Sequence, residues 1–356
     1  MLIRCIKNNL SLHLFVLSCA FSISALWAAP KEAPAQERLN FAYISPNASS
    51  SSVLWVAKEM GIFKKHGLDV NVIYIEGTPK ALMSMFAGEL QVVAGTGPAV
   101  VSAKLRGADV TMVMGFEVFL PYYLIATPGM NRIEDLKGKI GANHSAATSA
   151  DFAMRLGLRG IGLDPDRDVN LRVIGATNLR VIAMQQGQAQ FTVISAAERE
   201  FAEKMGFKVL ADLAGKRIPY PHSGVISSQK ILREKHDAML RFGRATIEAI
   251  HFFKTQKTQT IGVLKKYVKT DTNTLDSAYA YIRSAVPDLP YPTLEGMKTL
   301  TAEMGRTRPE VLKADPASFI DASFVKAIEE EGFIKTPWTE DAVGNLILLK
   351  LTPCPS

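Results

Sequence analysis

The sequence predicts a two-lobed α/β fold in which each lobe is a mostly parallel sheet flanked by helices, with two crossing strands joining the lobes. Three observations favour it. Residues 41–77 contain one complete strand, polar loop, helix, turn and strand, the unit of α/β sheets. Residues 77–94 and 175–194 share an order of glycine, polar cap, helix, glycine and strand. Segments 117–127 and 219–224 fit two passages between lobes. Such units also recur through general architecture, so the repeat indicates matching halves with or without duplication.

The first unit sets the pattern for the others. Residues 41–44 are short and apolar or aromatic, as a buried strand requires, and residues 45–52 form a polar loop. Helical spacing then places four apolar residues on one face, Val53, Val56, Ala57 and Met60. Residues 70–75 are almost wholly apolar, as in a parallel strand that is covered on both sides.

Two further strand-to-helix units complete the first part of lobe 1. Thr78 is expected to cap a helix that Pro79 begins. The expected elements are a helix to Gly88, a strand at 90–94, a helix ending near Gly107 and a strand at 110–116. Because these turns gather at one edge of an open parallel sheet, they predict a ligand crevice there.

Lobe 2 is expected to repeat this organisation and to return the chain to lobe 1. The predicted boundaries are 36–124 and 222–356 for lobe 1 and 125–221 for lobe 2. The expected elements of lobe 2 are a strand ending at Gly141, a polar turn at 143–149, a helix through Leu158, a strand at 169–174, a helix start at 175–178, a helix at 195–205 and a strand at 207–210. Helices are then expected at 229–253, 259–268, 274–285, 293–303 and 321–331, and residues 345–351 fit either a strand or a packed tail.

The amino terminus has the layout of a secretory leader, so we expect a periplasmic protein. Arg4 and Lys7 precede an apolar run that ends at Trp27. Ala33-Pro34-Ala35 is the best cleavage site, which makes residues 1–35 the signal peptide, although Ala28 or Ala29 also fits as a cleavage position. The same segment fits an uncleaved membrane anchor or lipid attachment at Cys19 less well than soluble export.

Composition and motifs exclude several classes of function. The net charge of +7 suits a soluble protein or an anionic ligand, but no run of five Lys or Arg indicates nucleic acid. Only Cys354 would remain after cleavage, so we expect no intramolecular disulfide, no thiolate metal cluster and no CxxC redox pair. We also expect no cofactor and no metal site. The sequence has no GxSxG, HExxH, P-loop or dinucleotide-binding glycine motif. We therefore expect no enzyme activity.

Two segments resemble a known family. Residues 54–63, LWVAKEMGIF, followed by HGLDV at 66–70, resemble the opening of nitrate/sulfonate/taurine-type substrate-binding proteins of ABC transporters, and 133–141 resembles their entry into the second lobe. The superfamily includes thiamine-pyrimidine synthase-like proteins. The resemblance implies a type II periplasmic binding protein fold and a monomeric receptor that delivers a small organic anion to an ABC permease and ATPase.

The resemblance leaves two competing functions, a thiamine-pyrimidine synthase-like enzyme and a ligand-sensing ectodomain. The related enzymes carry a cysteine-rich motif in the second lobe. This sequence has no cysteine between Cys19 and Cys354, which argues against the enzyme.

The ligand is expected where helix amino termini of the two lobes converge, because their free N–H groups and positive dipole ends bind anions. For any one serine, capping of its own helix is the simpler interpretation, and for His144 a local loop hydrogen bond is an equal alternative. Together the set favours a ligand site. The expected ligand-binding residues are Asn47, Ser50, Ser51, Ser52, Thr78, Thr96, Phe116, His144, Ser145, Thr148, Asn178, Ser195 and His222.

Lys80 and Arg180 occupy the first turns of the two matching helices. A cation there opposes the helix dipole, which suggests a nearby anion. A solvated surface position is an equal alternative for both residues.

Overall fold

The computed structural model describes residues 36–49, 51–146 and 148–333. The expectations for the leader at 1–35 with Cys19, for Ser50 and for the tail at 345–351 with Cys354 concern residues outside these ranges. The described part contains two five-stranded sheets, here called sheet A and sheet B.

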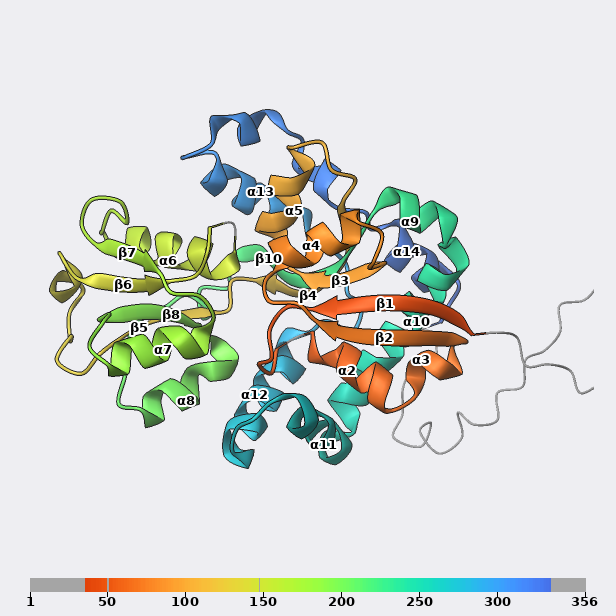
Figure 1. Ribbon diagram of the computed structural model, residues 1–356, viewed down its shortest axis with the longest axis horizontal. Helices are drawn as coiled ribbons and strands as arrows, with labels where there is room; N and C mark the ends of the chain where they lie inside the picture. The colour runs from red at the N-terminus through yellow and green to blue at the C-terminus, as the bar shows by residue number, and fades with distance from the viewer. Residues whose placement is uncertain (1–35, 50, 147, 334–356) are drawn as a thin grey trace, which may run out of the picture. The chain divides into compact units, whose positions relative to one another are not determined.

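Sheet A has the strand order β2-β1-β3-β10-β4 (Figure 1). β1 pairs in parallel with β2 and β3, whereas β10 is antiparallel to β3 and β4. Four of the five strands therefore run in one direction, as expected. The strands are β1 (Glu37–Tyr43), β2 (Leu68–Tyr74), β3 (Val92–Gly95), β4 (Thr111–Phe119) and β10 (Pro219–Ser227).

Sheet B has the order β7-β6-β8-β5-β9 and repeats this design. β6 is parallel to β7 and β8, and β5 is antiparallel to β8 and β9. The strands are β5 (Tyr122–Ala126), β6 (Ile140–Asn143), β7 (Asn170–Val173), β8 (Phe191–Ser195) and β9 (Lys208–Asp212). The two sheets confirm the predicted two-part α/β fold.

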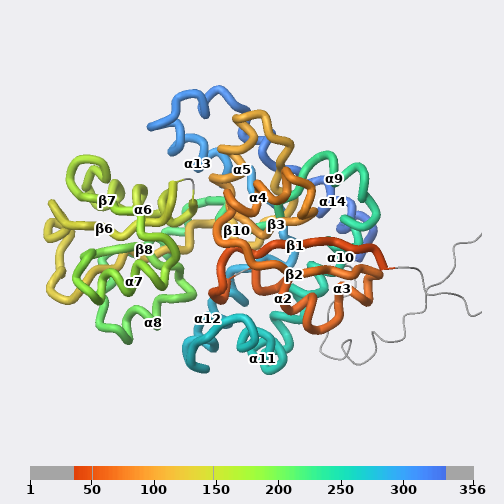
Figure 2. Tube along the Cα trace, viewed as in Figure 1, coloured from red at the N-terminus to blue at the C-terminus, as the bar shows by residue number. Residues whose placement is uncertain are grey.

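The chain passes from sheet A to sheet B between β4 and β5 and returns between β9 and β10 (Figure 2). The two passages lie side by side. The Leu120 N–H donates to the Ile218 carbonyl over 2.9 Å, and Pro219 pairs with Phe119. Segments about one hundred residues apart thus form one connection between the sheets.

Helices flank both sheets. Those that follow strands of sheet A are α2 (Ser52–Glu59), α3 (Ile62–Lys65), α4 (Thr78–Phe86) and α5 (Gly97–Lys104). Between the strands of sheet B lie η1 (Ile133–Leu136), α6 (Ser149–Gly160), α7 (Thr177–Gln185), η2 (Ala196–Glu198) and α8 (Arg199–Lys204), where η marks a 3₁₀ helix. After β10 come α9 (Gln229–Glu234), α10 (His236–Thr255), α11 (Lys257–Tyr267), α12 (Thr272–Ala285), α13 (Leu294–Met304), η3 (Pro309–Lys313), η4 (Pro316–Phe319) and α14 (Ser323–Glu330).

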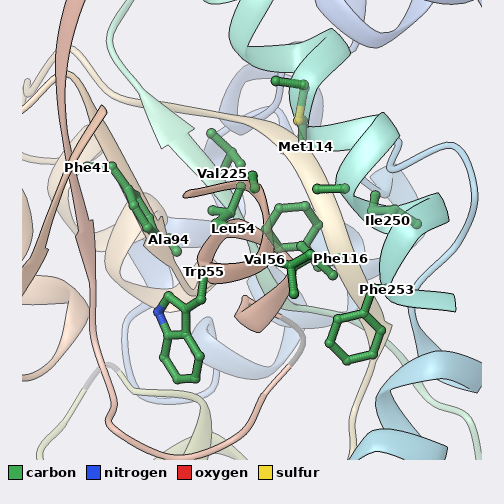
Figure 3. Packing of buried hydrophobic residues seen from close by; sticks show 14 of the residues in the cluster. Phe41, Leu54, Trp55, Val56, Ala94, Met114, Phe116, Val225, Ile250 and Phe253 are labelled. Atoms are coloured by element: carbon green, nitrogen blue, oxygen red, sulfur yellow. The ribbon is translucent and has the colours of Figure 1, made fainter. Parts of the chain in front are cut away.

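The core of sheet A is built around α2, as its apolar spacing predicts. Trp55 is fully buried and stacks on Tyr267 of α11, with ring centroids 4.5 Å apart. Figure 3 shows Leu54 and Val56 of the same helix packed with Phe116 of β4. Helices about two hundred residues apart in the sequence therefore share one core.

Three local predictions were wrong. The helix expected at 229–253 is two helices, because the backbone of Lys235 leaves helical geometry. The Lys235 Nζ donates to Oε1 of Glu37 over 2.6 Å. The helix expected at 195–205 begins as η2, where Ser195 and Glu198 form a capping box. Gly77, not Thr78, is the N-cap of α4, because the Thr78 hydroxyl accepts from the Thr96 N–H over 3.2 Å.

Within the described ranges, no helix combines the length and the apolar character needed to cross a bilayer.

Candidate ligand-binding site

A cavity of about 150 Å³ lies among loops that follow strands of both sheets. Sheet A lines it with residues after β1, β2 and β3, and sheet B with residues after β6, β7 and β8. β10 contributes His222 and Ser223. Because α/β sheets bind ligands at the carboxyl ends of their parallel strands, this cavity is the candidate site. A volume of this order holds a molecule about the size of benzene.

Eight of the expected ligand-binding residues line this cavity. They come from loops of both sheets and from β10, so the structure brings together residues far apart in sequence. They are Asn47, Ser51, Thr78, Thr96, His144, Thr148, Ser195 and His222.

The other expected residues are placed elsewhere. Ser52 is fully buried in the first turn of α2, where its hydroxyl accepts from the Ser49 N–H over 3.1 Å. Phe116 is fully buried in the core of sheet A, as Figure 3 shows. Ser145 and Asn178 are exposed and absent from the cavity wall. Ser50 lies outside the described residues.

The loop after β1 joins sheet A to sheet B at the cavity. The Asn47 Nδ2 donates to Oε1 of Glu198 over 2.6 Å. The hydroxyls of Ser49 and Ser51 lie 2.8 Å apart and satisfy each other. This loop therefore uses its polar groups partly for its own structure, although the side chain of Ser51, the N-cap of α2, makes no capping hydrogen bond.

His144 combines a local role with a place in the wall. The Ser145 N–H donates to His144 Nδ1 over 2.7 Å, so the local loop hydrogen bond is present. Burial, helped by the charge of Arg180, lowers the pKa of His144 below its ordinary value of 6.5. His144 is therefore a neutral imidazole in the cavity wall at neutral pH.

Arg180 is a buried cation in the cavity wall that was not among the expected ligand-binding residues. Its side chain is 1% exposed. One terminal nitrogen, Nη1, donates to the Val193 carbonyl (2.9 Å) and to Thr192 Oγ1 (3.1 Å), and Nη2 donates to Thr177 Oγ1 (3.0 Å). Burial lowers the pKa of Arg180, and the nearby Tyr122 and Glu198 oppose that shift. Among the described residues, no carboxylate lies within 4 Å of its guanidinium.

Glu198 is a charged residue of the cavity wall that the sequence analysis did not single out. Its Oε2 accepts from the backbone N–H and the hydroxyl of Ser195, at 3.2 and 2.9 Å. Burial raises the pKa of Glu198 above its ordinary value of 4.5, although Ser195 and Arg180 oppose that shift. Its position at the start of a helix after a strand was the available signal.

His222 links the cavity to a buried acid. Its Nε2 lies 3.6 Å from Oε2 of Glu117 in β4, and its ring meets Tyr122 edge-on at 5.2 Å. The hydroxyl of Tyr281 donates to Oε1 of Glu117 over 2.5 Å. Burial lowers the pKa of His222 to about 3, so the imidazole is neutral at neutral pH.

Two buried polar atoms of the cavity wall lack a hydrogen-bond partner in the described part of the chain. They are Arg180 Nε and His222 Nδ1. Buried polar groups are nearly always satisfied, so these atoms favour a ligand or water in the cavity. The same part of the chain shows no cluster of His, Cys, Asp and Glu that could hold a metal ion.

Known proteins resemble this chain in sequence and in fold. A Brucella abortus (strain 2308) protein, named as a binding protein without a stated ligand, is 25% identical over 232 residues, which cover 64% of this chain and 70% of the relative. The alkanesulfonate-binding protein SsuA from Xanthomonas axonopodis pv. citri, solved with MOPS, superposes with a TM-score of 0.68 at 16% identity over 82% of this chain and 100% of that chain. The desulfurization enzyme DSZB superposes with a TM-score of 0.62 at 13% identity over 83% and 99%.

The solved structures show that the fold is that of periplasmic binding proteins. The sequence match is more specific, because residues 48–259 match the family model described as NMT1/THI5 like, which covers more than half of the chain. The chain therefore belongs to the NMT1/THI5-like family, and this confirms the resemblance carried by residues 54–70 and 133–141.

Proposed function

We propose that this protein is an extracytoplasmic solute-binding receptor that delivers a small organic anion, such as a sulfonate or a carboxylate, to an ABC importer. The names of its relatives support a binding role, since the Brucella protein is named as a binding protein and SsuA as alkanesulfonate-binding. The proposed lobes are 36–124 with 222–356, and 125–221. A ligand that contacts both lobes favours their closed arrangement.

The proposal of an anionic ligand rests on the burial of Arg180 in the cavity wall. A buried charge is costly unless it is paired, and the described partners of this guanidinium are hydroxyls and a carbonyl. Its Nε has no partner and the residue lines the cavity. An anionic group placed there gains a charge-assisted hydrogen bond and neutralises the cation.

Two carboxylates in the wall limit the charge of the ligand. Glu76 is exposed and lies 4.0 Å from Lys80, so its charge is partly balanced at the surface. Burial raises the pKa of Glu198, because it disfavours the ionised form of the carboxyl. A ligand with a single negative charge suits this balance better than a dianion.

We infer that the protein binds its ligand without transforming it. The sequence lacks the cysteine-rich motif of the related enzymes, since it has no cysteine between Cys19 and Cys354. The likeness to DSZB, at 13% identity, concerns the fold. The leader-like residues 1–35 and the periplasmic binding protein fold support export to the periplasm, where we expect a monomer that meets an ABC permease and its ATPase.

A thermal-shift screen of sulfonates, carboxylates and pyrimidines tests this function, because a ligand that binds only the folded state raises its stability. We expect monoanions to raise the melting temperature of the wild type. The same anions should raise the melting temperature of Arg180→Gln far less. Lys80→Gln is the control, since Lys80 also lies in the first turn of its helix, α4, but is exposed. A response to neutral heterocycles alone would contradict the anionic ligand.

A further inference from the structure

The helix α12 connects three parts of the molecule. One of its faces packs in the core of sheet A through Leu275, Ala278 and Ile282. Other residues of α12 contact β4 and the helices that follow β8 of sheet B, η2 and α8, which lie beside it (Figure 1). A helix that is fixed to one sheet and contacts the other restrains how the two sheets move against each other.

The contacts of α12 with the sheet B part come from η2 and α8. The Ser277 hydroxyl donates to Oε2 of Glu200 in α8. The Lys204 Nζ lies 2.8 Å from Oε1 of Glu200 and 3.7 Å from Oδ1 of Asp271, the N-cap of α12. Ala197 of η2 is 7% exposed and belongs to the core of sheet A. Both polar and apolar contacts therefore join this segment to the sheet A part.

The segment that α12 contacts also forms part of the cavity wall. Glu198 of η2 lines the cavity and accepts from Asn47, which follows β1 of sheet A. Tyr281 lies one helical turn after Ser277 on the same side of α12, and its hydroxyl donates to Oε1 of Glu117 in β4 over 2.5 Å. All of these groups belong to the chain itself, so the contacts form without a ligand.

We propose that α12 is a latch that holds the two proposed lobes closed in the ligand-free protein, through the contact of Ser277 with Glu200. This inference rests on the two lobes of the proposed function but on no particular ligand. A ligand shifts an equilibrium only by the difference between its affinities for the two arrangements. Because the latch already favours the closed arrangement, the ligand-free protein is seldom open, and the rate of ligand entry depends on how often Ser277 releases Glu200.

Distance measurements across the cavity test the latch without a ligand. Nitroxide labels on Met83→Cys in α4 and Asn178→Cys in α7 report how far the lobes are apart, because both residues are exposed on helices that begin at the cavity wall. Cys5, Cys19 and Cys354 are replaced by Ser, so only the two chosen positions are labelled. We expect double electron–electron resonance to give one narrow distribution for the ligand-free chain with an intact latch.

Variants of Ser277 should open the protein. Ser277→Ala should raise the ratio of open to closed molecules at least about tenfold, because a hydrogen bond to a carboxylate is lost. Ser277→Asp should raise it further, since two carboxylates then face each other. Combining Ser277→Asp with Glu200→Lys should restore the narrow distribution. Ser284→Asp is the matched control and should change nothing, since Ser284 is exposed on α12 and its hydroxyl donates to its own helix.

The outcomes decide between a latch and a contact that merely accompanies closure. A broad distribution with an intact latch, or unchanged closure in both Ser277 variants, would overturn the proposal. An oppositely charged pair that stays open would overturn it as well. If Ser277→Asp fails to fold, Ser277→Ala decides. The thermal shift with anions and its loss in Arg180→Gln test the proposed function separately, so each can fail while the other stands.

Discussion

Asn47 and Glu198 form a hydrogen bond of 2.6 Å across the candidate site, from the side-chain nitrogen of one to Oε1 of the other. Asn47 follows β1 of sheet A, and Glu198 ends the short helix that follows β8 of sheet B. Both residues line the cavity. The contact therefore joins two walls that belong to different sheets.

Replacing Asn47 with Ala should weaken ligand binding about three- to tenfold, because the variant loses one hydrogen bond to a carboxylate between the walls. Calorimetric titration with the anion that gives the largest thermal shift measures the change. Asn178→Ala is the matched control, since Asn178 is exposed on α7 and outside the wall. Equal affinities for Asn47→Ala and the wild type would show that the contact has no role in closure.

Glu198→Gln should become more stable relative to the wild type as the pH rises from about 4 to 7. A carboxyl with a raised folded-state pKa contributes stability that is complete below its unfolded value of about 4.5 and is lost as the pH rises through the folded value. Glutamine cannot ionise and escapes this loss. The variant also loses a hydrogen-bond acceptor, which changes its stability by the same amount at every pH. The test therefore measures the melting temperatures of both proteins and follows how their difference changes with pH.

Glu200→Gln gives the control of opposite sign. Lys204 and Ser277 lower the pKa of Glu200, so its contribution is present above its ordinary value of 4.5 and is lost as the pH falls through the lower folded value. This variant should become less stable relative to the wild type over the same rise in pH. Parallel behaviour of the two variants would contradict the assigned shifts.

The sequence was sufficient to predict the two sheets and the edge at which the cavity lies, because apolar periodicity and polar strand-to-helix turns are local signals. It located the start of α7 at Gly175–Asn178 but selected Asn178, whereas Thr177 lines the cavity. One residue along a helix turns a side chain by about a quarter of a turn. Local spacing does not fix which residue of a polar turn faces the ligand.

Burial of charge was the part that sequence could not predict. Lys80 is the third residue of α4 and is exposed, whereas Arg180 is the fourth residue of α7 and is 1% exposed. This offset of one residue turns the two side chains to different faces of their helices, and Arg180 donates hydrogen bonds to Thr192 and Val193 of β8. Glu198 depends on Asn47, which is 151 residues away. Such contacts exist only after both sheets have formed.

Gly224→Ala should destabilise the protein by about 3 kcal/mol, the upper part of the range for overpacking a core. Gly224 lies in β10 opposite Gly115 of β4, and an added Cβ would collide with the Met114 carbonyl oxygen. Urea unfolding followed by circular dichroism measures the loss. Gly262→Ala in the exposed face of α11 is the control, because an added Cβ meets nothing within 4 Å. That variant should gain about 0.5–1 kcal/mol, and an equal loss in both would rule out the steric explanation.

Trp55→Ala should cost about 3–5 kcal/mol, whereas Trp55→Phe should cost less than about half of that. The indole stacks on Tyr267 with an angle of 6° between the ring planes and meets Tyr43 edge-on at 5.2 Å, so truncation to Ala removes both contacts. The indole Nε1 has no hydrogen-bond partner among the described residues. Phenylalanine keeps an aromatic ring in the core and removes that unsatisfied N–H, which offsets part of the lost volume. Chemical unfolding of the two variants separates ring packing from the polar atom. If Phe costs as much as Ala, the indole N–H makes a stabilising hydrogen bond and the unsatisfied-donor argument is wrong.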